Sequence, residues 1–450
     1  MSNFRPINRD TGFLLPPSVD EWLPQRHLAR FVVEVVDRLE LAEFEQAYRG
    51  SGSASYHPAM LLSLLIYGYA TRVFSSRALE RATYDSVAFR FIAGNEHPDH
   101  DTIAHFRKRF LVHIEGLFVE VLKLARAMGM LKLGTVALDG TKLHANASRH
   151  SALSYGHAKK LEKQLKREVA QLLRLAEQAD AADLPDGMSI PEELERREQR
   201  LAAIAEAQAT IEARVHERED ATYQAKLAAR EARQRRSGRK PPGRPPAPPT
   251  GRVEDKEQIN LTDEDSRIMP VAGGGFDQCY NAQAAVAADS LLIVASGLTQ
   301  AANDKQQLAP MLGRLRVLPQ SLGRVRRLLA DNGYFSEDNV ECCAAAKIEP
   351  LIALGREAHH ASWRRRFAPA PKPPPPTASA LERMAHRLKT PAGRKLYALR
   401  KQTPEPVFGS IKTAMGFRQF LLRGLPHVRG EWNLVTMSWN IKRMFTLQPV

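Results

Sequence analysis

The chain has 450 residues, of which 43% are hydrophobic, so a disordered chain is excluded and two or three domains with packed cores are expected. Its three cysteines lack the spacing of a zinc site and indicate a reducing compartment, and its longest apolar run, 59–70, is too short to cross a bilayer. The first residues contain no signal-peptide core, so we expect a cytoplasmic protein. The net charge of +15 is typical of a protein with a polyanionic partner.

Residues 1–130 predict a helical N-terminal domain. Apolar residues recur at helical spacing between 28 and 39 and again after Pro58, which suits the first turn of a helix. Short helices joined by polar turns are compatible with helix-turn-helix DNA binding, and a plain helical bundle is the alternative. A longer helix is expected over 103–128, and its candidate DNA contacts are Arg107, Lys108 and Arg109.

Three acids lie at the ends of predicted elements. The apolar run 135–138 predicts a strand that ends at Asp139, and the run 327–330 ends in the same way at Asp331. Glu405 stands in the first turn of a predicted helix. An acid at the end of a central strand is held rigidly yet can point into a crevice, which suits a metal ligand. For each acid alone the alternative is a turn or cap residue, and the rival acids are Asp263, Asp265 and Asp304.

A long insertion between the predicted strands separates Asp139 from Asp331 in the sequence. Residues 157–233 carry an approximate heptad stripe interrupted by a Pro-Asp-Gly turn, which favours a coiled-coil-like hairpin of two antiparallel helices over intermolecular pairing. Residues 234–256 form a basic, proline-rich linker that excludes helix and sheet. Arg244, between Gly243 and a proline, is a candidate for insertion into a DNA minor groove, and a solvated linker is the alternative.

Strands and helices alternate after residue 257. The segments 280–287 and 291–299 predict an antiparallel hairpin, and further strands are expected at 325–330 and 348–353. Helices between these strands imply an α+β fold, in which a mixed sheet is flanked by helices. Residues 381–450 contain 13 Lys or Arg and three acids, so the C-terminal helices are strongly basic. Two concentrated basic runs in one chain favour binding to a phosphate backbone.

The order of several motifs then identifies a family. The stretches VALDGT, TDEDSRIM, GFDQCYNAQAAV, LLADNGYFS, TPEPVFGSIK and GEWNLVTMSWNIKRMF resemble the DDE transposases of bacterial insertion sequences, which are mobile elements. The helical motifs HPAMLLSLLIYGYA, SSRALERA and DTIAHFRKRF extend this resemblance over almost the whole chain. The resemblance implies a ribonuclease H-like catalytic domain built from residues 131–156 and 257–450. It also implies that the catalytic and metal-binding residues are Asp139, Asp331 and Glu405.

In such a site, two Mg²⁺ ions activate the attacking oxygen, stabilise the charge on the phosphate and neutralise the leaving oxygen, and Mn²⁺ can substitute for them. The resemblance also implies a basic motif around the glutamate, formed by a tyrosine, an arginine and a lysine. It places this motif near Tyr397, at Arg400 or Lys401, and at Lys412. The usual spacings fall on Ala398 and Lys401, so either the register is shifted by one residue or Lys401 replaces the arginine.

The expected function is therefore DNA transposition. The enzyme would bind the terminal inverted repeats of its own element, cut DNA strands with Mg²⁺ and join the 3′ ends to target DNA. Its partner is double-stranded DNA, its active complex is expected to be a homo-oligomer, and its location is the cytoplasm, in association with the nucleoid. A nuclease of the same fold and a transposase-derived DNA-binding protein without catalysis are the alternatives.

Overall fold

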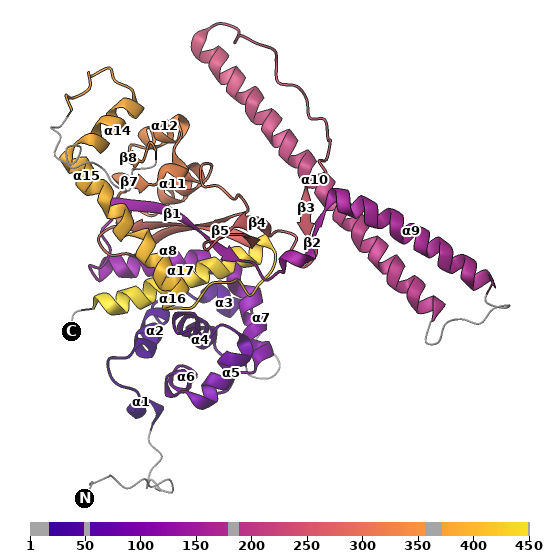
Figure 1. Cartoon of the computed structure of the whole chain (residues 1–450). Coiled ribbons are helices and arrows are strands. Elements are labelled where there is room, and N and C mark those ends of the chain that lie inside the picture. Colours follow the sequence, from indigo (N-terminus) through magenta and orange to yellow (C-terminus); the bar gives the residue numbers. More distant parts are fainter. Residues whose placement is uncertain (1–17, 49–54, 179–188, 356–370, 449–450) are drawn as a thin grey trace, which may run out of the picture. The chain divides into compact units, whose positions relative to one another are not determined.

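The structure is a computed structural model of the whole chain, and it describes residues 18–48, 55–178, 189–355 and 371–448 (Figure 1). The chain divides into two compact units. Residues 1–146 and 269–450 form the first unit, and residues 147–268 form the second. None of the helices in the described ranges is long and apolar enough to span a membrane.

The first unit begins with short helices, and several of them start at a side-chain cap. The Ser75 hydroxyl accepts a hydrogen bond from the Ala78 N–H, and the Asp99 carboxylate accepts one from the Thr102 N–H. Pro58 occupies the first turn of its helix, where no backbone donor is needed. The helices are α1 (Val19–Trp22), α2 (Leu28–Val36), α3 (Ala42–Gln46), α4 (Pro58–Ala70), α5 (Ser76–Asp85), α6 (Val87–Ile92), α7 (His100–Phe110) and α8 (Ile114–Ala127).

A mixed sheet follows the helices in the same unit. Its central strand β1 pairs antiparallel with β5 and parallel with β7, and the strand order is β4-β5-β1-β7-β8, with β6 also paired to β5. The pairs β5–β6 and β7–β8 are antiparallel and parallel, respectively. The strands are β1 (Thr135–His144), β4 (Arg267–Pro270), β5 (Phe276–Ala287), β6 (Ile293–Thr299), β7 (Arg327–Ala330) and β8 (Glu349–Ile352). An α+β fold with a mixed sheet flanked by helices is thereby confirmed.

Helices from the second half of the chain pack on this sheet. Helix α17 contacts β6, α4 and α8, so it joins the sheet to the N-terminal helices, and α8 and α17 lie side by side in Figure 1. Helices α12 and α14 pack against β8, and α16 packs against β1 and β5. The helices are α11 (Leu308–Arg316), α12 (Glu337–Ala345), α14 (Ala380–Lys389), α15 (Pro391–Ala398), α16 (Pro404–Thr413) and α17 (Leu425–Leu447).

Buried polar contacts fix α17 in place. The Asn440 side chain makes two hydrogen bonds of 2.8 Å with the backbone of Ile293, and the Trp432 indole donates to the Gln283 carbonyl. The fully buried Glu431 accepts a hydrogen bond of 2.7 Å from the Tyr69 hydroxyl of α4. Burial raises the pKa of Glu431, against the opposing effect of this hydrogen bond. Sheet and N-terminal helices are therefore coupled through polar as well as apolar contacts.

The second unit is built on a pair of long helices, α9 (Tyr155–Gln178) and α10 (Ile190–Ser237). Buried residues on both helices share one apolar cluster, which includes Leu165 of α9 and Ile204 and Ile211 of α10. Strands β2 (Ala152–Ser154) and β3 (Gln258–Asn260) pair antiparallel, so this unit extends beyond both the predicted hairpin and the predicted linker. Part of the linker folds back on α10, because Arg230 donates to the carbonyl of Gly243.

Candidate active site

The sheet register brings Asp139 and Asp331 together, although β1 does not end at Asp139 as predicted but continues to His144, because residues 140–144 still pair with β5. Strand β1 pairs parallel with β7, with Ala137 opposite Leu329, so two residues farther on Asp139 lies beside Asp331. Asp139 accepts a hydrogen bond from its neighbouring Gly140 N–H at 2.9 Å. Asp331 caps the short helix η4 (Asn332–Tyr334), because its Oδ1 accepts from the Gly333 N–H at 2.8 Å. Both carboxylates are thus fixed by local backbone donors.

The electrostatic surroundings of Asp139 are unfavourable for an isolated carboxylate. Burial, reinforced by the nearby charges of Asp331 and Asp304, raises the pKa of Asp139 to about 7, although the Gly140 N–H and Arg400 oppose the shift. The ionised form of such a side chain is stabilised most by a nearby cation, because a cation offsets both the cost of burial and the repulsion from the like charges. Strongly raised carboxyl pKa values are typical of functional sites.

Glu405 lies in the first turn of α16, and Arg400 stands between it and Asp139. One guanidinium nitrogen of Arg400, Nη2, lies 3.3 Å from Glu405 Oε1, and Nη1 lies 3.9 Å from Asp139 Oδ2. The Glu405 side chain is 51% exposed, whereas that of Arg400 is only 14% exposed. The structure therefore brings Asp139 and Asp331 together directly and joins Glu405 to them through the arginine.

The donor set of this edge suits a hard divalent cation. Asp139 and Asp331 offer carboxylate oxygens, which are the ligands that Mg²⁺ and Mn²⁺ prefer. Across the described ranges, however, no three His, Cys, Asp or Glu side chains are grouped closely enough to hold one metal ion. Glu405 cannot join the two aspartates while the Arg400 guanidinium lies between them. The two aspartates fit the expected ion, and Glu405 would need the arginine to move.

The register of the basic motif is visible in the short helix η5 (Leu399–Gln402), which connects α15 to α16. Tyr397 donates from its hydroxyl to the carbonyl of Ala330, the residue before Asp331, at 3.3 Å. Arg400 faces the acids, as described above, while Lys401 is exposed and its side chain lines a different hollow together with Lys389 and Arg394. Arg400, rather than Lys401, therefore faces the acids, while Tyr397 lines the same hollow as Lys401 and reaches only the backbone beside Asp331.

Lys412 lies farther along α16 and reaches the central strand. Its ammonium group donates to the Thr141 hydroxyl at 2.6 Å and to the Lys142 carbonyl at 3.1 Å. Burial lowers the pKa of Lys412, and the positive charge of Arg418 acts in the same direction. Lys412 therefore stands two residues along β1 from Asp139, where its charge can act on a phosphate bound at the edge.

The predicted basic cluster of α7 does not present all its residues to solvent. Arg107 is 8% exposed, and its guanidinium donates to the Phe74 carbonyl at 2.9 Å, so we correct its expected DNA contact to a role in packing the helices. Lys108 is exposed. Arg109 is exposed as well, but it donates to the Ala47 carbonyl and lies over the Tyr48 ring. Arg244 is exposed in the second unit.

Asp304, one of the rival acids in the sequence, lies beside the two aspartates at the centre of a polar cluster. Asp304, which follows β6, accepts hydrogen bonds of 2.7 Å from the side chains of Asn281 and Gln283 on β5. Lys142 of β1 lies 3.8 Å from the same carboxylate. The detectable signal was the pair Asn281 and Gln283, since two buried amides on one face of a strand require polar partners.

Two stretches of the chain match models of known protein families. Residues 17–109 match the family model "Transposase domain (DUF772)", and residues 372–445 match the model "Transposase DDE domain". The second match includes Arg400, Glu405 and Lys412. No curated protein and no solved structure matches the chain. The two family matches support a DDE-type transposase of an insertion sequence, as the motifs of the sequence had indicated.

Proposed function

We propose that this transposase binds the terminal inverted repeats of its insertion sequence and catalyses metal-dependent strand cleavage and strand transfer with Asp139, Asp331 and Glu405. The observation that carries the proposal is the register of β1 and β7, which places two carboxylates side by side at one sheet edge. The basic residues Arg400 and Lys412 border this edge. A site with these two charges can bind a phosphate and a divalent cation together.

Asp139 and Asp331 would hold Mg²⁺ or Mn²⁺, and Glu405 would complete the ligand set. When bound, two such ions supply an activated oxygen nucleophile and stabilise the charge that develops on the phosphate. Backbone donors hold the two aspartates in place, since Asp139 and Asp331 each accept a hydrogen bond from a backbone N–H. Arg400 neutralises Asp139 and Glu405 before DNA arrives, and its guanidinium then suits a bidentate contact to phosphate.

The strand order is consistent with a ribonuclease H-like catalytic domain, which we include in the proposal. An antiparallel set, β6-β5-β1, continues into the parallel strands β7 and β8, so Asp331 follows the carboxyl end of β7 and Asp139 lies beside it, midway along the neighbouring strand β1. In open sheets of this kind, ligands bind in the crevice outside the carboxyl ends of the strands. Residues 131–156 and 257–450 would supply this domain, with the helical domain 1–130 preceding it.

Several exposed or half-buried basic residues, together with Tyr397, would contact double-stranded DNA outside the catalytic site. Lys108 and Arg109 would act in the helical domain, Arg244 in the linker 234–256, Lys401 at the hollow lined by Lys389 and Arg394, and Tyr397 and Lys412 near the acids. Contacts of this kind are electrostatic and independent of sequence, so binding should weaken steeply with salt. We further propose that a homo-oligomer forms on the two ends of the element, with the hairpin 157–233 as the candidate pairing surface.

The direct test is a cleavage and joining assay with a DNA fragment that carries the ends of the element encoding this chain. The purified protein should cut the labelled ends and join their 3′ hydroxyls to a plasmid only when Mg²⁺ or Mn²⁺ is added. Asp139→Ala should abolish both products while DNA affinity is retained. Cleavage without joined products would instead indicate a nuclease, and DNA binding with no cleavage by the parent protein would indicate a binding protein without catalysis.

A further inference from the structure

A polar network lies beneath the two aspartates, and its centre is Asp304. One carboxylate oxygen of Asp304, Oδ1, accepts a hydrogen bond of 2.7 Å from the Gln283 amide and another of 2.7 Å from the Asn281 amide. The Lys142 ammonium group lies 3.8 Å from the same oxygen. This oxygen is therefore fully engaged, and the carboxylate is fixed against β5 and β1.

The network reaches both aspartates of the proposed site. Gln283 accepts a hydrogen bond from the Tyr334 hydroxyl, and Tyr334 belongs to the short helix η4 that Asp331 caps. On the other side, a Cβ added to Gly140 would lie 2.7 Å from Asp304 Oδ1, so the carboxylate fills the space beside the residue that follows Asp139. Asp304 thus lies beside Gly140 of β1 and is connected through Gln283 and Tyr334 to the helix that Asp331 caps.

The second oxygen of Asp304 has a different environment. Within the described ranges, Oδ2 accepts no hydrogen bond, and the side chain is 22% exposed. A Cβ placed on Gly333 would lie 3.8 Å from Asp304 Oδ2 and 3.0 Å from Asp331 Oδ1, so both oxygens flank the same point. Their separation is less than about 7 Å, a span that one divalent ion and its coordinated water can bridge.

We propose that Asp304 is a positioning residue for the divalent cation of the proposed site: its Oδ2 accepts a hydrogen bond from water coordinated to the ion held by Asp139 and Asp331. This inference rests on the proposed function. Mg²⁺ keeps several coordinated waters, and carboxylates that accept from those waters orient the ion. A direct ligand role is not proposed, because the described side chains do not form a three-ligand group.

Asp304→Asn separates this role from a purely structural one. The asparagine keeps one oxygen for the donors Gln283 and Asn281, so the network beneath the site survives. It replaces Oδ2 with an amide, which donates and cannot accept from a coordinated water. A residue that only supports the fold should tolerate this change. A residue that orients the hydrated ion should lose metal affinity by roughly 10- to 100-fold.

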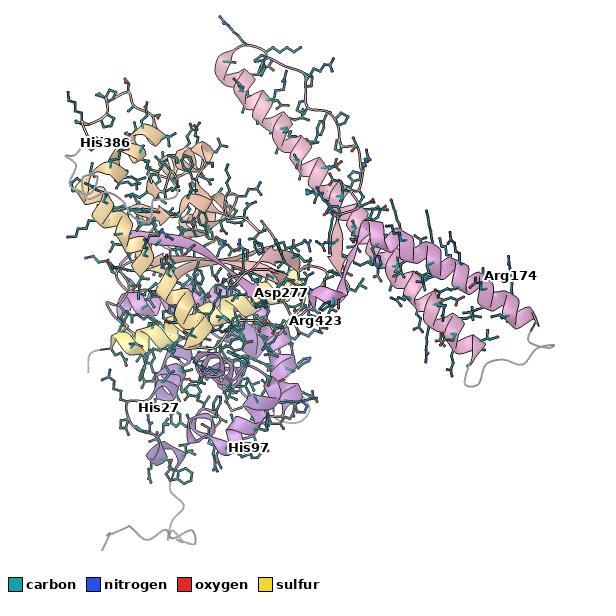
Figure 2. The ribbon with its side chains drawn as sticks, viewed as in Figure 1. His27, His97, Arg174, Asp277, His386 and Arg423 are labelled. Carbon is teal, nitrogen blue, oxygen red and sulfur yellow. The ribbon has the colours of Figure 1, made fainter. Side chains whose placement is uncertain are left out.

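The experiment measures Mn²⁺ binding to the full chain by the electron paramagnetic resonance signal of free Mn²⁺. Asp304→Asn should weaken binding at the site by roughly 10- to 100-fold, and Asp304→Glu, which restores a carboxylate, should recover part of the loss. The matched control is Asp277→Asn. Asp277, labelled in Figure 2, is the second residue of β5 and pairs with His144 at 3.1 Å. Its replacement should therefore leave Mn²⁺ binding unchanged.

Two outcomes distinguish this inference from the proposed function. If Asp139→Asn abolishes Mn²⁺ binding but Asp304→Asn binds as the parent does, the role of Asp304 is wrong and the proposed site stands. If Asp139→Asn binds Mn²⁺ as tightly as the parent, the proposed site itself is wrong. Should Asp304→Asn lower the melting temperature of the metal-free protein, Asp304→Glu decides, because failure to recover affinity in a folded protein overturns the inference.

Discussion

Asp139→Asn should stabilise the metal-free protein at the expense of its function. Burial is the main reason that the pKa of this carboxyl rises from 3.8 to about 7 in the folded protein. The folded state therefore holds the proton more tightly than the unfolded chain does. The stability that this group contributes is present below about pH 4 and is lost as the pH rises through about 7. Asparagine cannot ionise, so the variant escapes this loss.

The size of the effect follows from the same shift. The pKa difference is about 3 units, and each unit corresponds to about 1.4 kcal/mol, so the ionised carboxylate costs the metal-free folded state about 4 kcal/mol above neutral pH. The side chain is only 18% exposed, so solvent screening reduces this value little. The asparagine oxygen still accepts from the Gly140 N–H, and thus the local hydrogen bond is kept.

The assay is urea unfolding of parent and variant across the pH range, followed by tryptophan fluorescence, since Trp432 and Trp439 are buried in the first unit. At about pH 8 the variant should be more stable by up to about 4 kcal/mol, and near pH 4 the difference should fall below about 1 kcal/mol. Added Mg²⁺ should stabilise the parent and leave the variant unchanged. A parent that is more stable than the variant at about pH 8 without metal would refute this reasoning.

Further predictions concern other residues of the same unit. Arg400→Ala should tighten Mn²⁺ binding several-fold, because the guanidinium no longer occupies the space between Asp139 and Glu405, and weaker binding in a metal titration would contradict its position. Gly140→Ala should cost about 1–3 kcal/mol in urea unfolding, since the new Cβ would lie 2.3 Å from the Gln283 amide. Lys108→Ala should lower the salt slope of DNA binding by about 1, whereas Arg107→Ala should lower stability by about 1–3 kcal/mol and leave that slope unchanged. The reverse pattern in paired binding and unfolding experiments would return Arg107 to the DNA surface.

Local sequence patterns were sufficient for the strands that carry the acids. The apolar runs before Asp139 and Asp331 each form a strand, and β7 ends directly before Asp331 as predicted, whereas β1 continues past Asp139 to His144. Their pairing could not be read from the chain, because the register of β1 against β7 depends on contacts nearly two hundred residues apart. The choice between Arg400 and Lys401 likewise depends on η5, a turn that hydrophobic periodicity does not reveal.

The positions of Arg107 and Asp304 depend on the folded chain more than on their local sequence. Arg107 stands in a run of three basic residues, yet it shares the buried face of α7 with Ile103, Phe106 and Phe110, a helical spacing that the sequence already contained. The run of basic residues 107–109 drew the prediction toward DNA contact, although the apolar spacing already placed Arg107 on the buried face. Asp304 lies between β6 and α11 in a stretch without periodicity, so only the folded chain shows that it contacts Gln283.

The central claim is that the carboxylates of Asp139 and Asp331 share a divalent cation. The most direct measurement is the anomalous diffraction of Mn²⁺ in crystals of the full chain. We predict an Mn²⁺ peak about 2.2 Å from a carboxylate oxygen of each aspartate, with the Arg400 guanidinium displaced from between Asp139 and Glu405. Mn²⁺ bound elsewhere on the protein, with this sheet edge vacant at saturating metal, would contradict the account.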